Sequence, residues 1–374
     1  MVFVTSLSGD YSVKLALQLE KRGIKTSLLA LSDPYIKKLY INNDSHGDIE
    51  LSILRLPAGW SVKKRSEIAK KWLEKNDPNW ISFQSCLFSF NRNGLPLNLR
   101  PLLLNIGKER SWHIMFHELW LGESKSDSVK HRILGFFQKI LISRLIQDLK
   151  PKKIFTSNRF YQLCLEKIGV QSQIVPLFSN IPLGLNEGQD LFEMLPNEIL
   201  ANRKNYIIGS FFGNVYFFPE IGGKILQLKN LVEKENRNLL ITHLGRGLGV
   251  KKQFREWENL YGIKTYVFGE YQEQMIGDYF RQIDCGLSTY PKVLLEKSGS
   301  IAAMNFNKLP VILLRNSFVK DSRKLSWVKE VDEITNLSGF LKNAKTHESM
   351  FTIENTVNKY EKIFSVEGDK LLVL

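Results

Sequence analysis

The feature that most constrains this chain is an alternation of short apolar strands with amphipathic helices, which runs through one half and starts again in the other. Val2–Ser6 has the pattern of a buried strand, and Gly9 and Asp10 follow it as a tight turn. Ser12–Arg22 then has the pattern of an amphipathic helix that ends at Gly23. Repeated units of this kind predict a parallel sheet covered by helices.

The same alternation predicts two Rossmann-like domains. In the first half, further strands are expected at Thr26–Leu31, Leu51–Leu56, Trp80–Cys86, Trp112–Phe116, Lys153–Thr156 and Gln173–Val175. After an irregular polar stretch, a second set is expected at Tyr206–Gly209, Asn238–Thr242, Lys264–Phe268, Cys285–Thr289 and Val311–Leu313. A chain of 374 residues also exceeds what one hydrophobic core usually holds. The domains are expected to join near residues 178 to 200.

Composition places the chain among soluble globular proteins, with 43% hydrophobic and 24% charged residues. Cys86, Cys164 and Cys285 are far apart and lie in apolar runs, which predicts reduced thiols and no metal site. The start of the chain lacks the pattern of a signal peptide, and no apolar run has the length of a bilayer span. We therefore expect a cytoplasmic protein, with peripheral contact at the inner membrane surface left open.

The net charge of +14 predicts attraction to nucleotides, anionic lipid or nucleic acid. Nucleic acid is disfavoured, because no zinc-finger, helix-turn-helix or aromatic RNA-binding signature is present. Val129–Leu149 has the pattern of an amphipathic helix with basic residues, and two interpretations stay open: a core helix with a solvated basic face, which we favour, and a membrane contact. Its apolar positions are Ile133, Phe136, Phe137, Ile140, Leu141, Leu145 and Ile146.

The segment from Tyr290 to Leu314 has the pattern of a strand end, a polar loop, a short helix, a break at Pro310 and a buried strand. Five residues stand where that helix should begin: Glu296, Lys297, Ser298, Gly299 and Ser300. Free backbone N–H groups, two hydroxyls and an ammonium would meet there, which suits a diphosphate. The alternative is an ordinary serine cap with the lysine in water.

Ligands of open α/β sheets bind at the carboxyl ends of the strands, so the residues that follow the other predicted strands are further candidates. In the second half these are Gly213, Arg246, Phe268 and Lys292. Arg246 stands in a glycine-rich turn and would pair with phosphate oxygens, although an exposed arginine there is more often solvated.

In the first half, Gly9 and Asp10 follow the first strand, and His117 and Glu118 end a later one. Trp120 is expected to add an aromatic surface beside them, which suits a sugar. Asp10 is expected either to orient an acceptor hydroxyl or act as a base, or to serve only as a helix N-terminal charge. His113 falls inside the strand and is interpreted as a hydrogen-bonded histidine of the core or surface.

Together these features resemble GT-B glycosyltransferases, most closely the family-four-like nucleotide-sugar enzymes. The resemblance spans nearly the whole chain and depends on the His117 strand end, the linker Phe178–Pro182, the Phe268 strand end and the helix from Glu296 to Pro310. It implies an α/β fold of two Rossmann-like domains that face each other across a cleft. Residues 1–180 would bind the acceptor, residues 181–350 the nucleotide-sugar, and residues 351–374 would form a helix crossing back to the first domain.

The resemblance also assigns roles to residues. His117, Asp10 and Glu296 are the expected catalytic residues, with His117 contacting the transferred sugar. The backbone near Phe268 would meet the base, and Glu296 to Ser300 the sugar and diphosphate. No metal or cofactor is implied, because the nucleotide-sugar is itself a substrate.

Two positions depart from the family pattern. Met304 stands where a second glutamate is usual, and Gly209–Tyr216 lacks the usual cations. Lys297, Arg246 or Lys292 is the expected replacement, since a leaving diphosphate needs positive or N–H stabilisation.

The expected function is metal-independent, retaining transfer of a hexosyl-type group from a nucleotide-sugar to an acceptor, with an anionic or lipid-linked acceptor favoured by the charge. Two alternatives stay open: a non-catalytic nucleotide or carbohydrate binder of the same fold, and a nucleotide-sugar epimerase.

Overall fold

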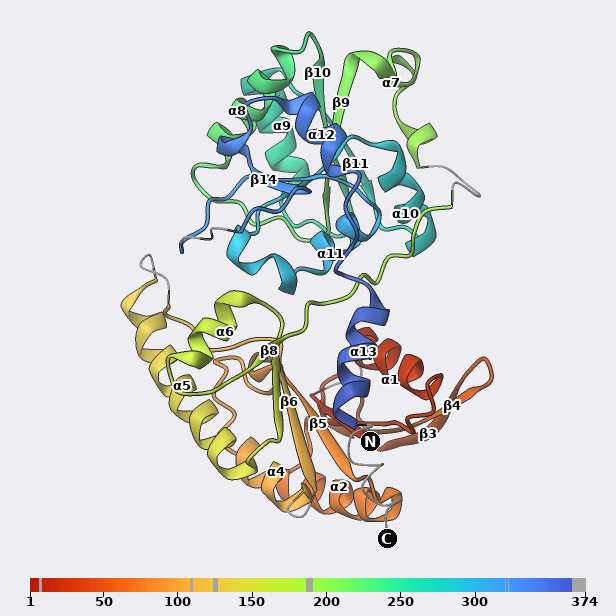
Figure 1. Cartoon of the computed structure of the whole chain (residues 1–374), viewed down its shortest axis with the longest axis vertical. Coiled ribbons are helices and arrows are strands. Elements are labelled where there is room, and N and C mark those ends of the chain that lie inside the picture. The colour runs from red at the N-terminus through yellow and green to blue at the C-terminus, as the bar shows by residue number, and fades with distance from the viewer. Residues whose placement is uncertain are drawn as a thin grey trace. The chain divides into compact units, whose positions relative to one another are not determined.

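The computed structural model describes residues 1–6, 9–107, 110–123, 127–185, 191–319, 321 and 323–364, and it contains two compact units (Figure 1). The N-terminal unit comprises Met1–Pro176 together with the chain from Ile353 onward, and the C-terminal unit comprises Leu177–Thr352. Residues 186–190 of the expected linker and 365–374 of the expected final helix lie outside the described residues.

The sheet of the N-terminal unit has eight strands in the order β3-β4-β2-β1-β5-β6-β7-β8. Their bounds are β1 Val2–Thr5, β2 Ser27–Asp33, β3 Tyr40–His46, β4 Ile49–Pro57, β5 Trp80–Ser85, β6 Ser111–Phe116, β7 Lys153–Thr156 and β8 Gln173–Ile174. All pairs are parallel except β3 with β4, which form an antiparallel hairpin around Gly47 at φ 64°. We did not predict β3, because it lies at the exposed edge of the sheet and its mostly polar sequence lacks the apolar pattern from which strands were predicted.

Helices cover both faces of this sheet. They are α1 Asp10–Glu20, α2 Val62–Asn76, α3 Leu87–Phe90, α4 Leu99–Gly107, α5 Val129–Leu149, α6 Arg159–Glu166 and α13 Ile353–Phe364. The first helix, α1, and the last, α13, lie side by side on one face (Figure 1). Right-handed crossovers place α2, α4 and α5 on the other face, where α4 contacts both of its neighbours.

The last helix belongs to the core of the N-terminal unit. Tyr360 of α13 is fully buried, and its ring centroid lies 5.1 Å from that of His113 and 5.2 Å from that of Phe155. At the surface of the same helix, Arg22 donates to Asn358 at 2.6 Å and pairs with Glu361 at 2.7 Å. The end of the described chain is therefore fixed by packing against β6, β7 and α1.

The sheet of the C-terminal unit has six parallel strands in the order β11-β10-β9-β12-β13-β14. Their bounds are β9 Tyr206–Phe212, β10 Asn238–Leu244, β11 Lys264–Gly269, β12 Cys285–Ser288, β13 Val311–Leu313 and β14 Val328–Glu330. Its α-helices are α7 Asn197–Ala201, α8 Ile221–Glu233, α9 Val250–Tyr261, α10 Glu273–Gln282, α11 Gly299–Phe306 and α12 Leu337–Ala344. The predicted α/β class with two Rossmann-like domains is confirmed, and only the three-residue β14 was missed in this unit.

Helix α5 differs from our favoured interpretation. Its buried residues are Gly135, Gln138, Leu141, Ile142, Leu145 and Leu149. Ile133, Phe136 and Phe137, which we expected to face the core, are exposed. Gly135 is required here, because a Cβ at this position would lie 1.9 Å from the carbonyl oxygen of Leu121. This close approach sets which face of α5 is buried. Among the described residues, no helix is long and apolar enough to cross a membrane.

We expect Tyr360→Ala to destabilise the N-terminal unit by about 3–5 kcal/mol, because it removes a fully buried aromatic ring and leaves a cavity. Hydrogen exchange of the amides in β6 and β7 would measure the loss within this unit. Tyr35→Ala is the matched control, since Tyr35 is exposed, and it should change stability by less than about 0.5 kcal/mol. Equal exchange in the Tyr360→Ala variant and the natural protein would contradict the packing of α13.

Candidate functional site

His117 lies directly after β6, and a chain of hydrogen bonds links its side chain to the core. Its Nε2 lies 2.9 Å from Oε1 of Gln84, whose Nε2 donates to Ser82 Oγ at 2.8 Å. An amide oxygen accepts, so Nε2 of His117 carries a proton and donates it to Gln84. Ser82 Oγ lies 2.8 Å from Nδ1 of His113. This network orients the His117 ring at the carboxyl edge of the sheet.

His113 is a core residue, as expected. It is fully buried, and burial lowers its pKa to about 3, with His117 adding a smaller effect in the same direction. His113 is therefore neutral at physiological pH and supports the network without carrying charge.

Gly9 and Asp10 begin helix α1 after the first strand. Gly9 is the N-cap and has no side chain that could cap the helix, while Asp10 is exposed in the first helical turn. This position agrees with a helix N-terminal charge. Tyr11, one residue later, presents its ring edge-on to His117 with centroids 5.0 Å apart. The first turn of α1 thus meets the residue that follows β6 through Tyr11.

Glu118 contacts Cys86, which follows β5. The Cys86 thiol donates to Oε2 of Glu118 at 3.1 Å, and burial together with this carboxylate raises the pKa of Cys86 to about 11. The expected aromatic surface is wrong: Trp120 is buried, and its Nε1 donates to Glu123 Oε1 at 2.6 Å. The indole N–H is hydrogen-bonded within the loop, and the buried ring has no exposed face that could contact a sugar.

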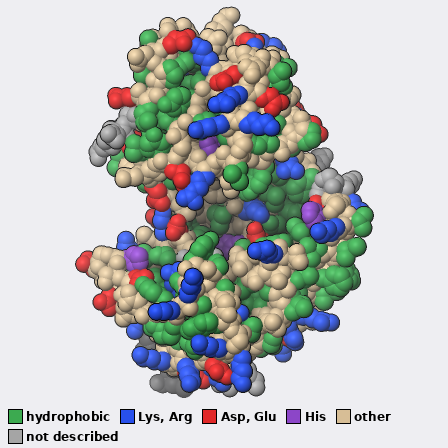
Figure 2. Space-filling view, turned by 180° about the vertical axis from the view of Figure 1, so that it is seen from behind, with side chains coloured by type: hydrophobic (Ala, Val, Ile, Leu, Met, Phe, Trp, Pro, Cys, Tyr) green, Lys and Arg blue, Asp and Glu red, His purple; other side chains and the backbone are tan. Residues whose placement is uncertain are grey.

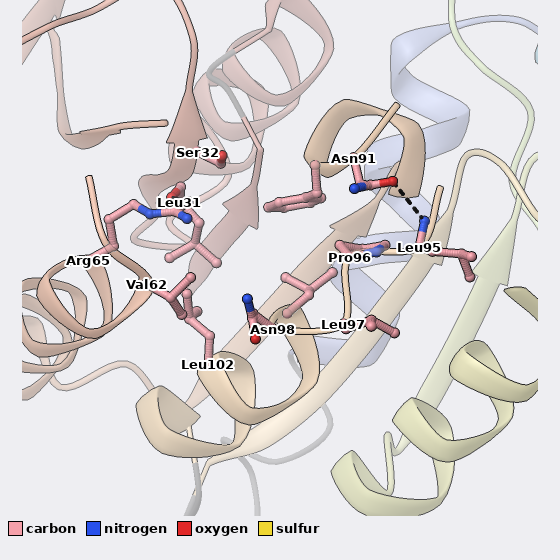
Figure 3. Close-up of a pocket in the computed structure, with 12 residues that line it drawn as sticks. Leu31, Ser32, Val62, Arg65, Asn91, Leu95, Pro96, Leu97, Asn98 and Leu102 are labelled. Atoms are coloured by element: carbon pink, nitrogen blue, oxygen red, sulfur yellow. Dashed lines mark hydrogen bonds between the residues drawn. The ribbon is translucent and has the colours of Figure 1, made fainter. Parts of the chain in front are cut away.

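A cavity of about 320 Å³ opens beside the carboxyl end of β2 (Figure 3). Its walls are mostly apolar and come from the end of β2, the first turn of α2, and the chain from Phe90 to Leu102. The polar side chains that line it are Ser32, Arg65, Asn91 and Asn98. The cavity therefore combines an apolar body with a few polar groups, as ligand sites of soluble proteins usually do.

Arg65 is the charged group of this cavity. Its Nη1 donates to the carbonyl of Leu31 at 2.8 Å and its Nε to that of Trp60 at 3.2 Å. No carboxylate of the described residues forms an ion pair with Arg65. Burial lowers its pKa, although the guanidinium keeps its charge at neutral pH. A partly desolvated cation held only by neutral carbonyls favours an anionic ligand.

In the C-terminal sheet, the strand order reverses between β9 and β12, which is where open α/β sheets bind ligands. Gly213 turns the chain after β9 with φ 72°, and its carbonyl accepts from His243 Nε2 at 2.8 Å. Three residues further, the N–H of Tyr216 donates to Oγ1 of Thr289 at 3.0 Å, and Thr289 directly follows β12. The loops after the two strands are thus joined at the reversal.

The predicted turn between β12 and α11 consists of a short 3₁₀-helix followed directly by the N-cap of α11. Lys292–Lys297 is a 3₁₀-helix, and Ser298 is the N-cap of α11, accepting from the N–H of Ile301 at 3.3 Å. Ser298 Oγ lies 3.1 Å from Ser300 Oγ. Ser298 is buried and Gly299 exposed, so the first turn of the helix opens outward at Gly299. Capping by Ser298 satisfies the N–H of Ile301, and the first N–H groups of a helix have no partner within the helix itself.

Glu296 is almost completely buried, at 2% exposure. Its Oε1 pairs with Arg323, which also pairs with Asp321 at 2.5 Å. Oε2 is buried and has no hydrogen-bond partner among the described residues. Burial raises the pKa of Glu296, and the charge of Arg323 opposes that shift. One oxygen of this carboxylate thus retains the capacity to accept a hydrogen bond.

The other predicted cations differ in exposure. Lys292 is buried, with Nζ 3.7 Å from Glu333 Oε1. Arg246 is fully solvated except for a pair with Glu270 at 2.6 Å. Lys297 is partly exposed, in the same segment as Glu296 and Ser298. Of the three, Lys297 lies nearest in sequence to the open turn.

Phe268 and Met304 complete the predicted positions. Phe268 is the second-last residue of β11, and its ring centroid lies 5.0 Å from that of Tyr279. The carbonyl of Gly269, the last residue of the strand, accepts from the N–H of Gly245 at 2.6 Å. Met304 is buried, and a Cβ on Gly286 would lie 2.4 Å from its sulfur. Met304 therefore fills the core beneath β12.

Several residues of these sites escaped the sequence analysis, namely Tyr11, Arg65, Gln84 and Arg323. Each acts through a partner distant in sequence, and none stands in a motif, so the sequence holds no local signal for them. Among the described residues, no group of three or more His, Cys, Asp or Glu side chains could hold a metal ion.

Solved structures with similar folds cover nearly the whole chain. A glycosyltransferase from Rickettsia africae has a TM-score of 0.59 at 12% identity, covering 97% of both chains. HepE of Anabaena, in complex with UDP and glucose, has a TM-score of 0.56 at 10% identity, covering 98% of this chain and 99% of that one. A UDP-GlcNAc 2-epimerase from Neisseria meningitidis, bound to UDP-GlcNAc, has a TM-score of 0.50 at 12% identity, covering 97% and 98%.

No protein-family model matches this chain, and no curated protein sequence matches it significantly. The structural likenesses define the class of protein: the chain has the GT-B fold, which these glycosyltransferases share with the epimerase.

The contact between Glu118 and Cys86 can be tested through thiol reactivity. Removing the carboxylate charge in Glu118→Gln should lower the pKa of Cys86 and increase its thiolate fraction at pH 8.5. The rate of iodoacetamide labelling of Cys86, measured by peptide mass spectrometry, should rise about threefold for each unit by which its pKa falls. The thiolate fraction rises about tenfold per unit, but a thiolate of lower pKa is a weaker nucleophile, which offsets part of that increase. Glu354→Gln, at an exposed position, should leave the rate unchanged. An unchanged rate in Glu118→Gln would rule out the contact.

Proposed function

We propose that this protein is a glycosyltransferase that moves a hexosyl-type group from a nucleotide-sugar to an acceptor. The observation that carries the proposal is the reversal point of the C-terminal sheet, where the β9 and β12 loops join beside an open helix N-terminus. Backbone N–H groups at such a helix end favour a diphosphate. Both kinds of GT-B protein compared above carry UDP or a UDP-sugar in their solved structures, which supports a nucleotide-sugar as the donor.

In this proposal, Lys297, Ser300 and the N–H groups of the α11 turn bind the diphosphate and stabilise it as it leaves. Glu296 accepts a hydrogen bond from a hydroxyl of the transferred sugar through Oε2, which has no partner in the described structure. Gly213 and the backbone near Phe268 border the space for the nucleoside. Lys297 is preferred to Arg246 and Lys292 for the phosphate, because it directly precedes Ser298, the N-cap of α11.

The N-terminal unit would bind the acceptor. His117 lies at the carboxyl edge of the sheet and is held in orientation by Gln84, so it is suited to contact a hydroxyl group of the sugar or acceptor. Asp10 is exposed at the same sheet edge, where it orients an acceptor hydroxyl. The retaining outcome and the independence of metal follow from the resemblance and form part of the proposal. The three unpaired cysteines support a cytoplasmic location.

The cavity at Arg65 favours a transferase over an epimerase. An epimerase acts on its nucleotide-sugar alone and needs no acceptor, whereas a transferase needs a second binding site. The cavity of about 320 Å³ lies within the N-terminal unit, which supports a second binding site there. Its apolar walls and unpaired guanidinium suit an acceptor with an apolar body and an anionic group, such as a lipid-linked phosphate.

The donor site can be tested by thermal shift with UDP-, GDP-, ADP-, CDP- and dTDP-sugars, since a ligand that binds the folded state raises its apparent stability. We expect one nucleotide to stabilise the protein selectively. Lys297→Ala should weaken that binding about tenfold or more, because it removes a charge-assisted hydrogen bond to phosphate. Lys251→Ala, which removes an exposed lysine from α9, is the matched control and should leave the affinity unchanged.

Equal donor affinity and turnover in Lys297→Ala would exclude this lysine from the phosphate site. Incubation with the selected donor and no acceptor separates the classes of enzyme. An epimerase would convert the sugar of the donor, whereas a transferase would leave its configuration intact. Selective binding with neither conversion nor transfer to any acceptor would identify a non-catalytic binder.

The acceptor cavity can be tested with octyl phosphate, used below the concentration at which it aggregates. Arg65→Gln should weaken its binding about tenfold or more by calorimetry, because the guanidinium is the only cation among the described residues that line the cavity. Octyl glucoside, which carries no charge, should bind equally to both forms. Arg92→Gln, at an exposed arginine of the same unit, is the control for general attraction to the positive surface. Equal loss in the two arginine variants would contradict a specific role for Arg65.

A further inference from the structure

Helix α5 is apolar on two opposite faces. Leu141, Ile142, Leu145 and Leu149 pack into the N-terminal unit. On the other side, Val129, Ile133, Phe136 and Phe137 remain exposed, at 71%, 56%, 60% and 52%. Their spacing of four, three and one residues places all four on one face of the first three turns. A surface helix of a soluble monomer normally exposes polar residues there, so this face is suited to a partner.

The exposed face is fixed in position and cannot rotate into the core. Gly135, on the opposite side, lies against the carbonyl of Leu121 with no space for a Cβ. Gln138 is also buried on that side, where it accepts from the N–H of Leu121 at 2.9 Å and donates to the carbonyl of Asn93 at 2.7 Å. These contacts hold Phe136 and Phe137 outward, with their rings edge-to-face at a centroid distance of 5.6 Å.

Basic residues border the exposed face. Lys130 and Arg132 lie on its two sides, and Lys139 and Arg144 follow within the next turns. Asp148 is the one acidic residue of α5, and it lies in the last turn, paired with Arg100. Figure 2 shows green hydrophobic and blue basic side chains next to each other along this flank of the N-terminal unit. The surface therefore combines an apolar strip with positive charge on both sides.

We propose that the first three turns of α5 dock the protein on an anionic lipid bilayer. Val129, Ile133, Phe136 and Phe137 enter the boundary between headgroups and acyl chains, and the bordering lysines and arginines pair with lipid phosphates. The charge argues against a second copy of this chain as the occupant, because a twofold contact between two such faces would bring like charges together. An apolar strip at the centre of the face also argues against nucleic acid, whose backbone presents charge throughout.

The place of this face in the fold gives docking a consequence for the acceptor. Helix α5 begins where the chain returns from the carboxyl end of β6, so its first turns lie toward the sheet edge that carries His117. The carbonyl of Asn93, bound by Gln138, belongs to the loop whose residues line the Arg65 cavity. Docking would therefore bring that cavity close to the lipid headgroups. This last step depends on the proposed function, whereas docking itself does not.

The test is co-sedimentation of the full chain with vesicles of phosphatidylcholine alone and with vesicles in which about a third of the lipid is anionic phosphatidylglycerol. We expect binding to the anionic vesicles, weakened by salt, and little binding to neutral ones. Phe136→Ser/Phe137→Ser should lower the partition coefficient about tenfold or more, because it removes two rings from the contact. Tyr35→Ser/Leu260→Ser removes two exposed apolar side chains elsewhere and should bind as the natural chain does.

Three results would overturn the proposal. The first is equal vesicle binding by Phe136→Ser/Phe137→Ser and the natural chain. The second is a dimer, seen by ultracentrifugation without lipid, that the same substitutions abolish, which would assign the face to a second copy. The third is tight, salt-sensitive binding of oligonucleotides that competes with the vesicles. Unchanged thermal unfolding of the variants would show that they fold. Donor binding measured without vesicles tests the proposed function separately, since neither result depends on the other.

Discussion

Parallel strand pairing is the constraint on which both candidate sites depend. In a parallel sheet every strand ends at the same edge, so loops distant in sequence meet there. The N–H of Tyr216 reaches Thr289 across 73 residues because β9 and β12 are neighbours in the sheet. In the N-terminal unit, the N–H of His117 reaches the carbonyl of Ser85 at 3.1 Å in the same way. Chemistry-bearing residues gather at these edges because the crossover connections bring them there.

At the carboxyl edge of each sheet, a charged side chain that is partly or fully buried can form further hydrogen bonds to a ligand. Glu296 keeps one oxygen without a donor even though Arg323 holds the other. Arg65 is held by two neutral carbonyls and pairs with no carboxylate of the described chain. Removing such groups from water is costly unless hydrogen bonds compensate, and here the compensation is incomplete on both sides. A donor group of a ligand at Glu296 and an anionic group of a ligand at Arg65 would complete these interactions.

Much of this architecture could be predicted from the sequence, because buried parallel strands leave strong apolar runs. The strands from Trp80, Trp112 and Lys153 lie within one or two residues of their expected bounds. The cap at Ser298 and the strand end at His117 were also predictable, since each depends on local pattern. The partner of Glu296 was not, because Arg323 lies 27 residues away and no spacing rule joins them. Trp120 was predicted to be an exposed aromatic surface, but it is buried. A tryptophan after a strand fits an exposed site or the core equally well, and here its Nε1 donates to Glu123 within the loop.

Helix α5 shows why periodicity alone does not determine which face is buried. With apolar residues on both sides, either face satisfies the helical pattern, and the choice falls to contacts that the pattern does not contain. Here Gly135 and Gln138 determine which face is buried. Gly135 allows the backbone of Leu121 to approach the helix, and Gln138 forms hydrogen bonds to the backbone of Leu121 and Asn93. The apolar residues left outside would promote self-association in a neutral protein. The net charge of +14 opposes that association, because two copies of the chain repel each other. In the proposed docking, the same positive charge attracts this face to an anionic surface.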